Sequence, residues 1–181
     1  MRDERDGQSY VRFGAMVAAA TVVMYVLTYM NTFQLSHVQF SEHRVYMMLM
    51  MGAAMAVVML LFMLGMYRNR TVNTAILVGA AILFAVALFL VRSETTVQDG
   101  SYMSAMIPHH SIAILTSERS ELSDVRVCEL AVEIIEAQRR EIDEMEWLIS
   151  DIGANGVAAT AADAAQRPVP EFSGSASRHC G

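Results

Sequence analysis

Three long apolar runs constrain this chain more than any other feature of its sequence. They cover residues 13–30, 45–67 and 75–91, and none of them contains a charged residue or a proline. A helix rises about 1.5 Å per residue, so each run, with its flanking residues, can cross a hydrocarbon core of about 30 Å. A helix also satisfies its own backbone hydrogen bonds, which lipid cannot do. We therefore predict an all-α chain that begins with three transmembrane helices in contact with membrane lipid.

The arginines that flank the runs predict an orientation. Five share one side, namely Arg2, Arg5, Arg12, Arg68 and Arg70, whereas Arg44 and Arg92 lie on the other. Positive residues close to membrane spans accumulate on the cytoplasmic side. We therefore predict a multi-pass protein of a cytoplasmic membrane, with residues 1–12 inside the cell and residues 92–181 outside.

Small residues recur four positions apart within the runs. The pairs are Gly14 with Ala18, Gly52 with Ala56, and Ala75 with Gly79. Such pairs let helix backbones approach closely, although helices rich in alanine also contain them by chance. In either case we expect the spans to bundle together or to dimerise.

The second run carries methionines along one helical face. They are Met48, Met51, Met55, Met59, Met63 and Met66. Two interpretations are open, because methionine packs well between helices and its thioether is also a ligand for Cu(I). Packing is the more common role of methionine inside a membrane, so a copper path is kept as the alternative.

The region after the third run is acidic. Residues 92–152 contain five arginines and thirteen acidic residues, a net charge of −8, whereas the whole chain has a net charge of −6. An acidic surface repels the phosphates of nucleic acids, so we do not expect a nucleic-acid partner. Such a surface suits cations, but it is more often a solvated helix face.

The same region has the pattern of two helices. Apolar positions recur at helical spacing over residues 103–114 and again over 127–152, on either side of the polar stretch 120–124. A short connection places consecutive helices side by side in opposite directions. We predict an antiparallel two-helix hairpin over residues 92–152, in which His109 and His110 face residues 131–136.

Capping signals mark the expected ends of these helices. Thr96 and Asp99 have the spacing of a capping box, Ser123 or Asp124 can cap the second helix, and Gly153 and Gly156 can end it. Pro108 either kinks the first helix or begins a new one, which would place the two histidines in a first turn.

The tail, residues 153–181, is rich in Ala, Gly, Ser and Pro and has no periodicity, so we expect it to be disordered. It contains Cys180, and the other cysteine, Cys128, lies in the apolar pattern of the second predicted helix. A disulfide between them is possible outside the cytoplasm, but spacing alone does not establish it.

The most informative stretch reads Met103-Ser-Ala-Met106-Ile-Pro108-His109-His110. It is followed further along by Ala137-Gln138, Glu141-Ile142, Met145 and Trp147-Leu148. Over Asp99 to Asp151 the chain resembles the bacterial family called "domain of unknown function 305", which has an M-I-P-H-H signature.

The resemblance implies a fold and a metal. Members have a ferritin-like helical arrangement, and some are extracytoplasmic copper-binding proteins linked to metal tolerance. Carried over by position, the candidate ligands are Met103, Met106, His109, His110 and Met145. The chain has one hairpin where longer members have two, so we expect at most half of a ferritin-like bundle within one copy.

The residues themselves favour the same metal. Thioether and imidazole ligands suit Cu(I) and tolerate Cu(II). A di-iron site needs a glutamate three residues before a histidine, but Met106 and Ile107 occupy those positions. Zinc is the alternative, through the two histidines and Glu133 or Glu136, and these glutamates together with Gln138 are candidates for supporting residues around a metal.

These features lead to two hypotheses of function. The first is copper binding or buffering at the outer face of the membrane, with a metal-handling partner protein that the sequence does not identify. The second is a structural or interaction module that dimerises through the hairpin without a metal. No nucleophile pair, general base or phosphate-binding glycine loop is visible, so we do not expect an enzyme. A hairpin cannot bury both sides of its apolar stripe alone, so we expect a homodimer or a cover from the loop between the first two spans.

Overall fold

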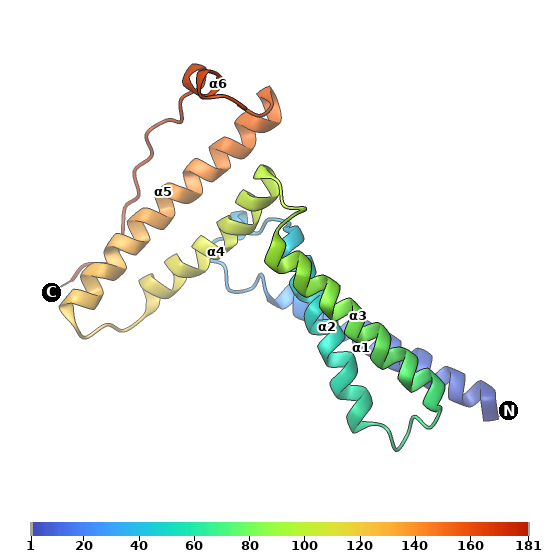
Figure 1. Ribbon diagram of the computed structural model, residues 1–181. Coiled ribbons are helices and arrows are strands. Elements are labelled where there is room, and N and C mark those ends of the chain that lie inside the picture. Colours follow the sequence, from blue (N-terminus) through green and yellow to red (C-terminus); the bar gives the residue numbers. More distant parts are fainter. Residues whose placement is uncertain (1, 181) are drawn as a thin grey trace. The chain divides into compact units, whose positions relative to one another are not determined.

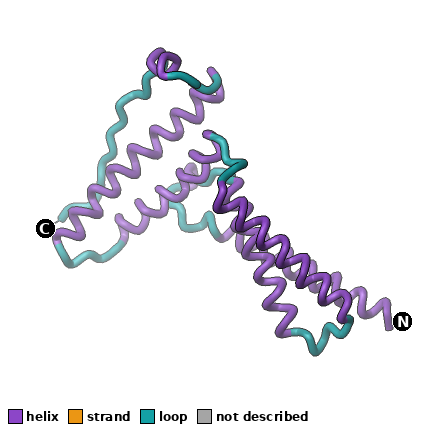
Figure 2. Tube along the Cα trace, in the orientation of Figure 1, coloured by secondary structure: helices purple, strands orange, loops and turns teal. Residues whose placement is uncertain are grey.

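The computed structural model describes residues 2–180 and divides into two compact units. The first unit comprises the chain up to Thr28 together with Glu42–Val97, and the second comprises Tyr29–Ser41 together with the chain from Gln98 onward. The regular structure of the described residues is helical throughout, as Figures 1 and 2 show. The all-α prediction is therefore confirmed.

The first unit consists of α1 (Arg2–Leu27), α2 (Glu42–Phe62) and α3 (Arg70–Ser93). Three segments, Gly7–Leu27, Glu42–Phe62 and Arg70–Ser93, are long and apolar enough to cross a membrane. The three spans predicted from the sequence are thus present as helices, with different ends. The second helix stops at Phe62 rather than residue 67, because the chain must turn before Asn69, whose side chain accepts a hydrogen bond from Val72 N and caps α3.

Helix α2 packs against both α1 and α3. Where α1 and α2 meet, a Cβ on Gly52 would lie 2.8 Å from Thr21 Oγ1, so this contact needs a glycine. A Cβ on Gly14 or Gly79 would meet nothing within 4 Å. Among the glycines in the predicted pairs of small residues, only Gly52 is therefore explained by close packing within the chain.

The second unit is built on α4 (Asp99–Arg119) and α5 (Val125–Asn155), which pack against each other. Its core is a cluster of four isoleucines that are nearly or fully buried: Ile107, Ile114, Ile135 and Ile142. Phe33, from the loop before α2, packs against this cluster. The same loop forms a short 3-10 turn at Leu35–His37, so part of the cover that a lone hairpin lacks comes from this loop.

The structure corrects two expectations about α4. Its cap is Gln98, which makes no side-chain capping bond, so the predicted capping box of Thr96 and Asp99 is wrong. Pro108 lies inside one continuous helix, so no new helix begins there. The proline removes one backbone hydrogen bond of the helix without ending it.

The second helix, α5, has the predicted kinds of ends. Asp124 caps it by accepting a hydrogen bond from Arg126 N at 2.9 Å. Because Arg126 also donates to this carboxylate from its side chain, the pKa of Asp124 is held below its usual value. Gly156 follows the last helical residue with φ 79°, a left-handed value that favours glycine, whereas Gly153 lies within the helix.

The structure also differs from the expectation of a disordered tail. Residues Ala161–Gln166 form a short helix, α6, with a capping box between Thr160 and Asp163. The segment after α6 runs back beside α5 (Figure 1) and ends in a disulfide between Cys128 and Cys180. A tail of this composition cannot bury enough apolar surface to fold by itself, and the disulfide supplies a fixed end that composition does not reveal.

Candidate metal centre

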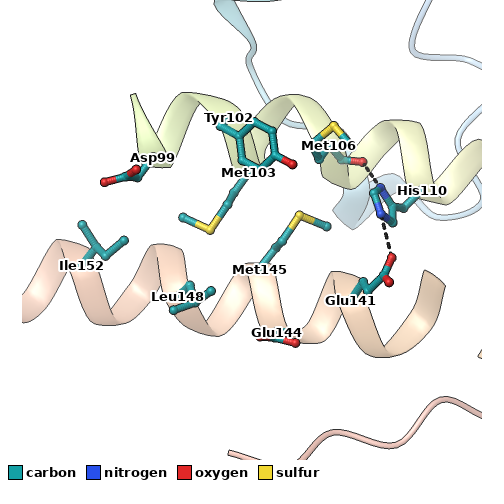
Figure 3. A pocket seen from close by; sticks show the side chains of 10 residues that line it. All are labelled: Asp99, Tyr102, Met103, Met106, His110, Glu141, Glu144, Met145, Leu148 and Ile152. Carbon is teal, nitrogen blue, oxygen red and sulfur yellow. Dashed lines mark hydrogen bonds and ion pairs between the residues drawn. The ribbon is translucent and has the colours of Figure 1, made fainter. Parts of the chain in front are cut away.

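An open groove of about 550 Å³ lies between α4 and α5. Helix α4 contributes Asp99, Tyr102, Met103, Met106 and His110, and α5 contributes Glu141, Glu144, Met145, Leu148 and Ile152 (Figure 3). On α4 the inward positions recur three or four residues apart, which is the spacing of one helical face. The groove is thus a consequence of the helical stripe seen in the sequence.

Three methionines line the groove. Met103 and Met145 extend from opposite helices into the space between them, as Figure 3 shows. Met103 is buried, with 6% of its surface exposed, and Met145 also packs against the isoleucine cluster. Met106 lies one turn after Met103 on the same lining. All three candidate thioether ligands therefore line one groove, but only Met103 and Met145 extend between the helices, and Met106 lies against α4 itself (Figure 3).

His110 is held in a defined orientation at the end of this row. Its Nδ1 lies 2.8 Å from the backbone oxygen of Met106 (Figure 3). A carbonyl oxygen only accepts hydrogen bonds, so Nδ1 carries the proton and donates. Only 12% of the side chain is exposed, and the other ring nitrogen, Nε2, faces Glu141 with 2.9 Å to Oε2. In a metal-binding histidine one ring nitrogen is commonly bonded to a carbonyl and the other holds the metal. Here Nε2 contacts the Glu141 carboxylate, so a metal at this nitrogen would have to displace that contact.

Glu141 is the groove residue in contact with His110, and sequence reasoning did not select it. Its Oε2 contacts Nε2 of His110 and also accepts a hydrogen bond from Gln138 Nε2 at 3.4 Å. Gln138, a predicted supporting residue, therefore lies next to the groove and helps to orient this carboxylate. Glu141 was visible in the sequence as part of the family pattern, but only the pairing of the helices connects it with His110.

The adjacent histidines diverge. His109 is exposed and does not line the groove, and its ring centroid lies 6.0 Å from that of His110. Glu133 and Glu136 are exposed as well and lie outside the groove lining. Neighbouring residues on a helix point in directions about 100° apart, so one histidine of the pair faces away from any site that the other forms.

The structure therefore does not assemble the zinc set that the sequence suggested. Residues 2–180 contain no group of three His, Cys, Asp or Glu side chains placed to hold a metal ion. The sulfur atoms of the methionines are the additional donors beside His110 and Glu141.

The predicted pairing of the two helices is wrong in register. His110 faces Glu141, beyond the predicted stretch 131–136, and Met145 lies with Met103 rather than near residue 97. The difference in register comes from the segment that connects α4 with α5. Ser120 and Asp124, the caps on either side of it, both have extended backbone angles, so the chain does not reverse in a tight turn midway between the helices.

A buried polar contact fixes the loop before α2 onto α4, next to the groove. Ser111 is fully buried, and its Oγ accepts a hydrogen bond from Phe33 N at 2.7 Å. The same oxygen lies 2.9 Å from Nδ1 of His37. Burial lowers the pKa of His37, while the charges of Glu146 and Asp143 raise it to a smaller extent. A neutral ring satisfies this contact as acceptor or as donor, according to its tautomer, so the pair needs no buried charge.

Comparison with known proteins identifies the region that carries the groove. Residues 93–177 match the family described as "Domain of unknown function (DUF305)". This part of the chain belongs to that family. All groove residues lie within the DUF305 domain, whereas Phe33 and His37, which cover its core, lie outside it.

One relative is a viral protein. The "Uncharacterized protein L153" of Acanthamoeba polyphaga mimivirus is 26% identical over 147 residues, which cover 76% of this chain and 93% of the relative. Only four residues follow the DUF305 region, so an alignment of this length includes residues before 93 as well. No solved structure matches the chain.

Proposed function

We propose that this chain is a membrane-anchored protein that binds copper outside the cytoplasm, through a methionine and histidine site in its DUF305 domain. The observation that carries this proposal is the groove in which Met103, Met106 and Met145 lie with an oriented His110. Binding, buffering or tolerance of the metal would follow from such a site. No step of the proposal requires an enzymatic reaction.

The donor set fits copper better than other metals. Thioethers are soft ligands that select Cu(I), and imidazole suits copper in both oxidation states. In this site Met103, Met106, Met145 and Nε2 of His110 would hold the ion. Glu141 already faces that nitrogen and could stay as a neighbour or bind Cu(II). Zinc and iron sites use several nitrogen or carboxylate ligands. The groove also contains the carboxylates of Asp99, Glu141 and Glu144, but among the described residues no three His, Cys, Asp or Glu side chains are placed to hold one ion, so the three thioethers are the donors that distinguish it.

Two independent features support an extracytoplasmic position for the DUF305 domain. The arginines around the three apolar helices favour a cytoplasmic N-terminus, and an odd number of spans then carries residues after 92 across the membrane. The domain also contains the disulfide between Cys128 and Cys180. Disulfides persist outside the cytoplasm and are rare within it.

Half of a ferritin-like bundle is the arrangement that we propose for α4 and α5. A second copy would complete a four-helix bundle. The alternative function is a structural or interaction module that dimerises in this way without a metal. Its support is the His110–Glu141–Gln138 contact, which can stabilise the helix pair by itself.

Substitution of one histidine at a time tests the proposal. We expect His110→Ala to lower the affinity for Cu(I), measured on the full chain in detergent against a chromogenic Cu(I) chelator, by at least about tenfold. His109→Ala is the matched control, because this neighbour is exposed and outside the groove. Equal affinity of both variants and the wild type would contradict the metal site. A loss of thermal stability in His110→Ala without a change in copper affinity would favour the structural module instead.

A further inference from the structure

The end of the chain covers one face of the helix pair. We call residues 172–180 the strap. Ala176 packs against the isoleucine cluster of α4 and α5, and Ser173 and Ser175 line a small cavity of about 220 Å³ with Ile114 and Ile142. At Gly174 the strap approaches α5 so closely that a Cβ would collide with the backbone carbonyl of Glu136. The strap therefore covers this face beside the loop before α2, whose residues Phe33, Gln34 and His37 line the same cavity.

The attachments of the strap gather at its last four residues. Ser177 Oγ donates to the carboxylate of Glu118 at 2.7 Å, and this bond is the main reason that the pKa of Glu118 lies below its usual value. Arg178 donates to the backbone oxygen of Ser120 at the end of α4. The disulfide from Cys180 to Cys128 completes the attachment. A single covalent bond therefore joins the strap to α5.

The side chains of the strap bury little apolar surface. Its sequence is Phe-Ser-Gly-Ser-Ala-Ser-Arg-His-Cys, with one large apolar residue, Phe172. Burial of apolar surface stabilises a contact by about 25 cal/mol per Å², so small side chains contribute little. The strap therefore depends on the disulfide and on its hydrogen bonds more than on buried apolar surface.

The face beneath the strap suits a second copy of itself. Ile114 and Ile142, which line the cavity with the strap, belong to its buried centre. At its edge Glu118 and Arg139 form an ion pair of 2.9 Å, so the face carries both signs of charge. In a two-fold dimer each residue meets the other copy's complementary residue, so a glutamate and an arginine on one face can pair across the interface as well. Paired hairpins of this kind form four-helix bundles.

We propose that the strap is a releasable cover of a self-association face, and that reduction of the disulfide by a dithiol lets a second copy take its place. In the reduction a thiolate of the dithiol attacks one sulfur, the other cysteine leaves as a thiolate, and the second thiol of the reductant then closes its own disulfide. Two electrons pass to the cysteines, which take up two protons to become thiols. Arg178 Nη1 lies 3.8 Å from Cys128 Sγ, where its charge stabilises a departing thiolate.

The mass of the full-length protein in detergent tests this proposal. We expect the oxidised wild type to be monomeric and the reduced wild type to double its protein mass in light scattering. Cys180→Ser should dimerise without reductant, because it lacks the covalent attachment. Gly174→Val keeps both cysteines but pushes the strap off α5, so it should dimerise under oxidising conditions. Glu171→Val, at an exposed residue just before the strap that lines no cavity, is the matched control and should stay monomeric.

Three outcomes would overturn the proposal. The first is the same protein mass in the oxidised and reduced states, and the second is a mass that Gly174→Val and Glu171→Val change equally. The third is loss of helix content on reduction, measured by circular dichroism, because the strap would then be part of the fold rather than a cover. None of these outcomes bears on copper affinity, so the copper site is tested separately.

Discussion

The two units of this protein bury their helices in different ways. In the apolar helices of the first unit only 6%, 17% and 11% of the residues in the most apolar windows are buried, so most of their apolar surface is left for lipid. In the second unit the four isoleucines of the core are at most 2% exposed, and a loop and the strap complete their cover. In the first unit most apolar side chains therefore lie on the outside, where lipid can contact them. In the second unit they form a buried core.

The methionines show the same contrast. Of the six methionines in the stripe, Met63 and Met66 lie beyond the end of α2. Met59 and Met63 pack against the apolar cluster of the first unit, which is the common role of methionine between helices. In α4 and α5, Met103, Met106 and Met145 line a groove beside an imidazole and a carboxylate. A stripe of methionines is thus informative about metal only where nitrogen or oxygen donors converge with it.

Truncation of an apolar side chain should change the free energy of unfolding far more in the second unit than in the first, and this is the largest difference that we expect between them. Ile135→Ala removes a fully buried side chain from the core of the second unit and should lower the free energy of unfolding by about 2–5 kcal/mol. Leu61→Ala removes a half-exposed side chain from α2 and should have little effect, because lipid fills the space. Thermal unfolding of both variants in the same detergent measures the difference, and equal losses would contradict the comparison.

A second test compares the two sets of methionines by copper affinity. The double variant Met103→Leu with Met145→Leu keeps apolar volume but removes two sulfurs, and we expect Cu(I) affinity to fall on the order of 100-fold. Met51→Leu with Met55→Leu makes the same chemical change in α2 and should leave the affinity unchanged. If the α2 variant lost as much affinity, the copper path that we set aside in the membrane would have to be restored.

A third test addresses close packing within the first unit. Gly52→Ala should destabilise the contact of α1 with α2 by about 1–3 kcal/mol, because its Cβ would lie 2.8 Å from Thr21 Oγ1, which is itself bonded to Val17 O. Gly79→Ala adds the same methyl group where nothing lies within 4 Å. Resistance of the folded protein to denaturing detergent distinguishes them, and equal resistance of the two variants would show that Gly52 is not a packing contact.

Much of the fold was predictable from the sequence, for reasons that depend on local periodicity. The three apolar helices follow from charge-free runs, and the Asp124 cap follows from its own side chain. The convergence of Met103, Met106 and His110 follows from their spacing on one helix. Glu141, the residue of α5 that contacts His110, was not predicted. The register of the two helices depends on the backbone angles of residues 120–124, and no residue pattern specifies those angles.

The cover of the hairpin was less predictable because it depends on contacts between distant segments. The tail has a composition typical of disorder, yet its last residues attach to Glu118 and Cys128. The contact of His37 with Ser111 joins residues far apart in the chain. Each polar partner looks ordinary in its own segment, and only the fold brings the two together.

The contact between His37 and Ser111 gives the last and smallest test. Burial lowers the pKa of His37, so between pH 7.5 and 5.5 the unfolded chain takes up a proton at this residue more readily than the folded chain. The second unit should therefore keep its full stability above about pH 6.5 and lose part of it as the pH falls below that value.

His37→Asn should flatten this dependence, since its amide oxygen can still accept from Ser111 but does not titrate. His109→Asn, at an exposed site, should leave the profile as in the wild type. Thermal unfolding across this pH range stays above the region in which Glu118 and Asp124 titrate, both of which have lowered pKa values, so the loss can be assigned to a histidine. An unchanged slope in His37→Asn would show that the loop before α2 is not held to α4 through a neutral imidazole.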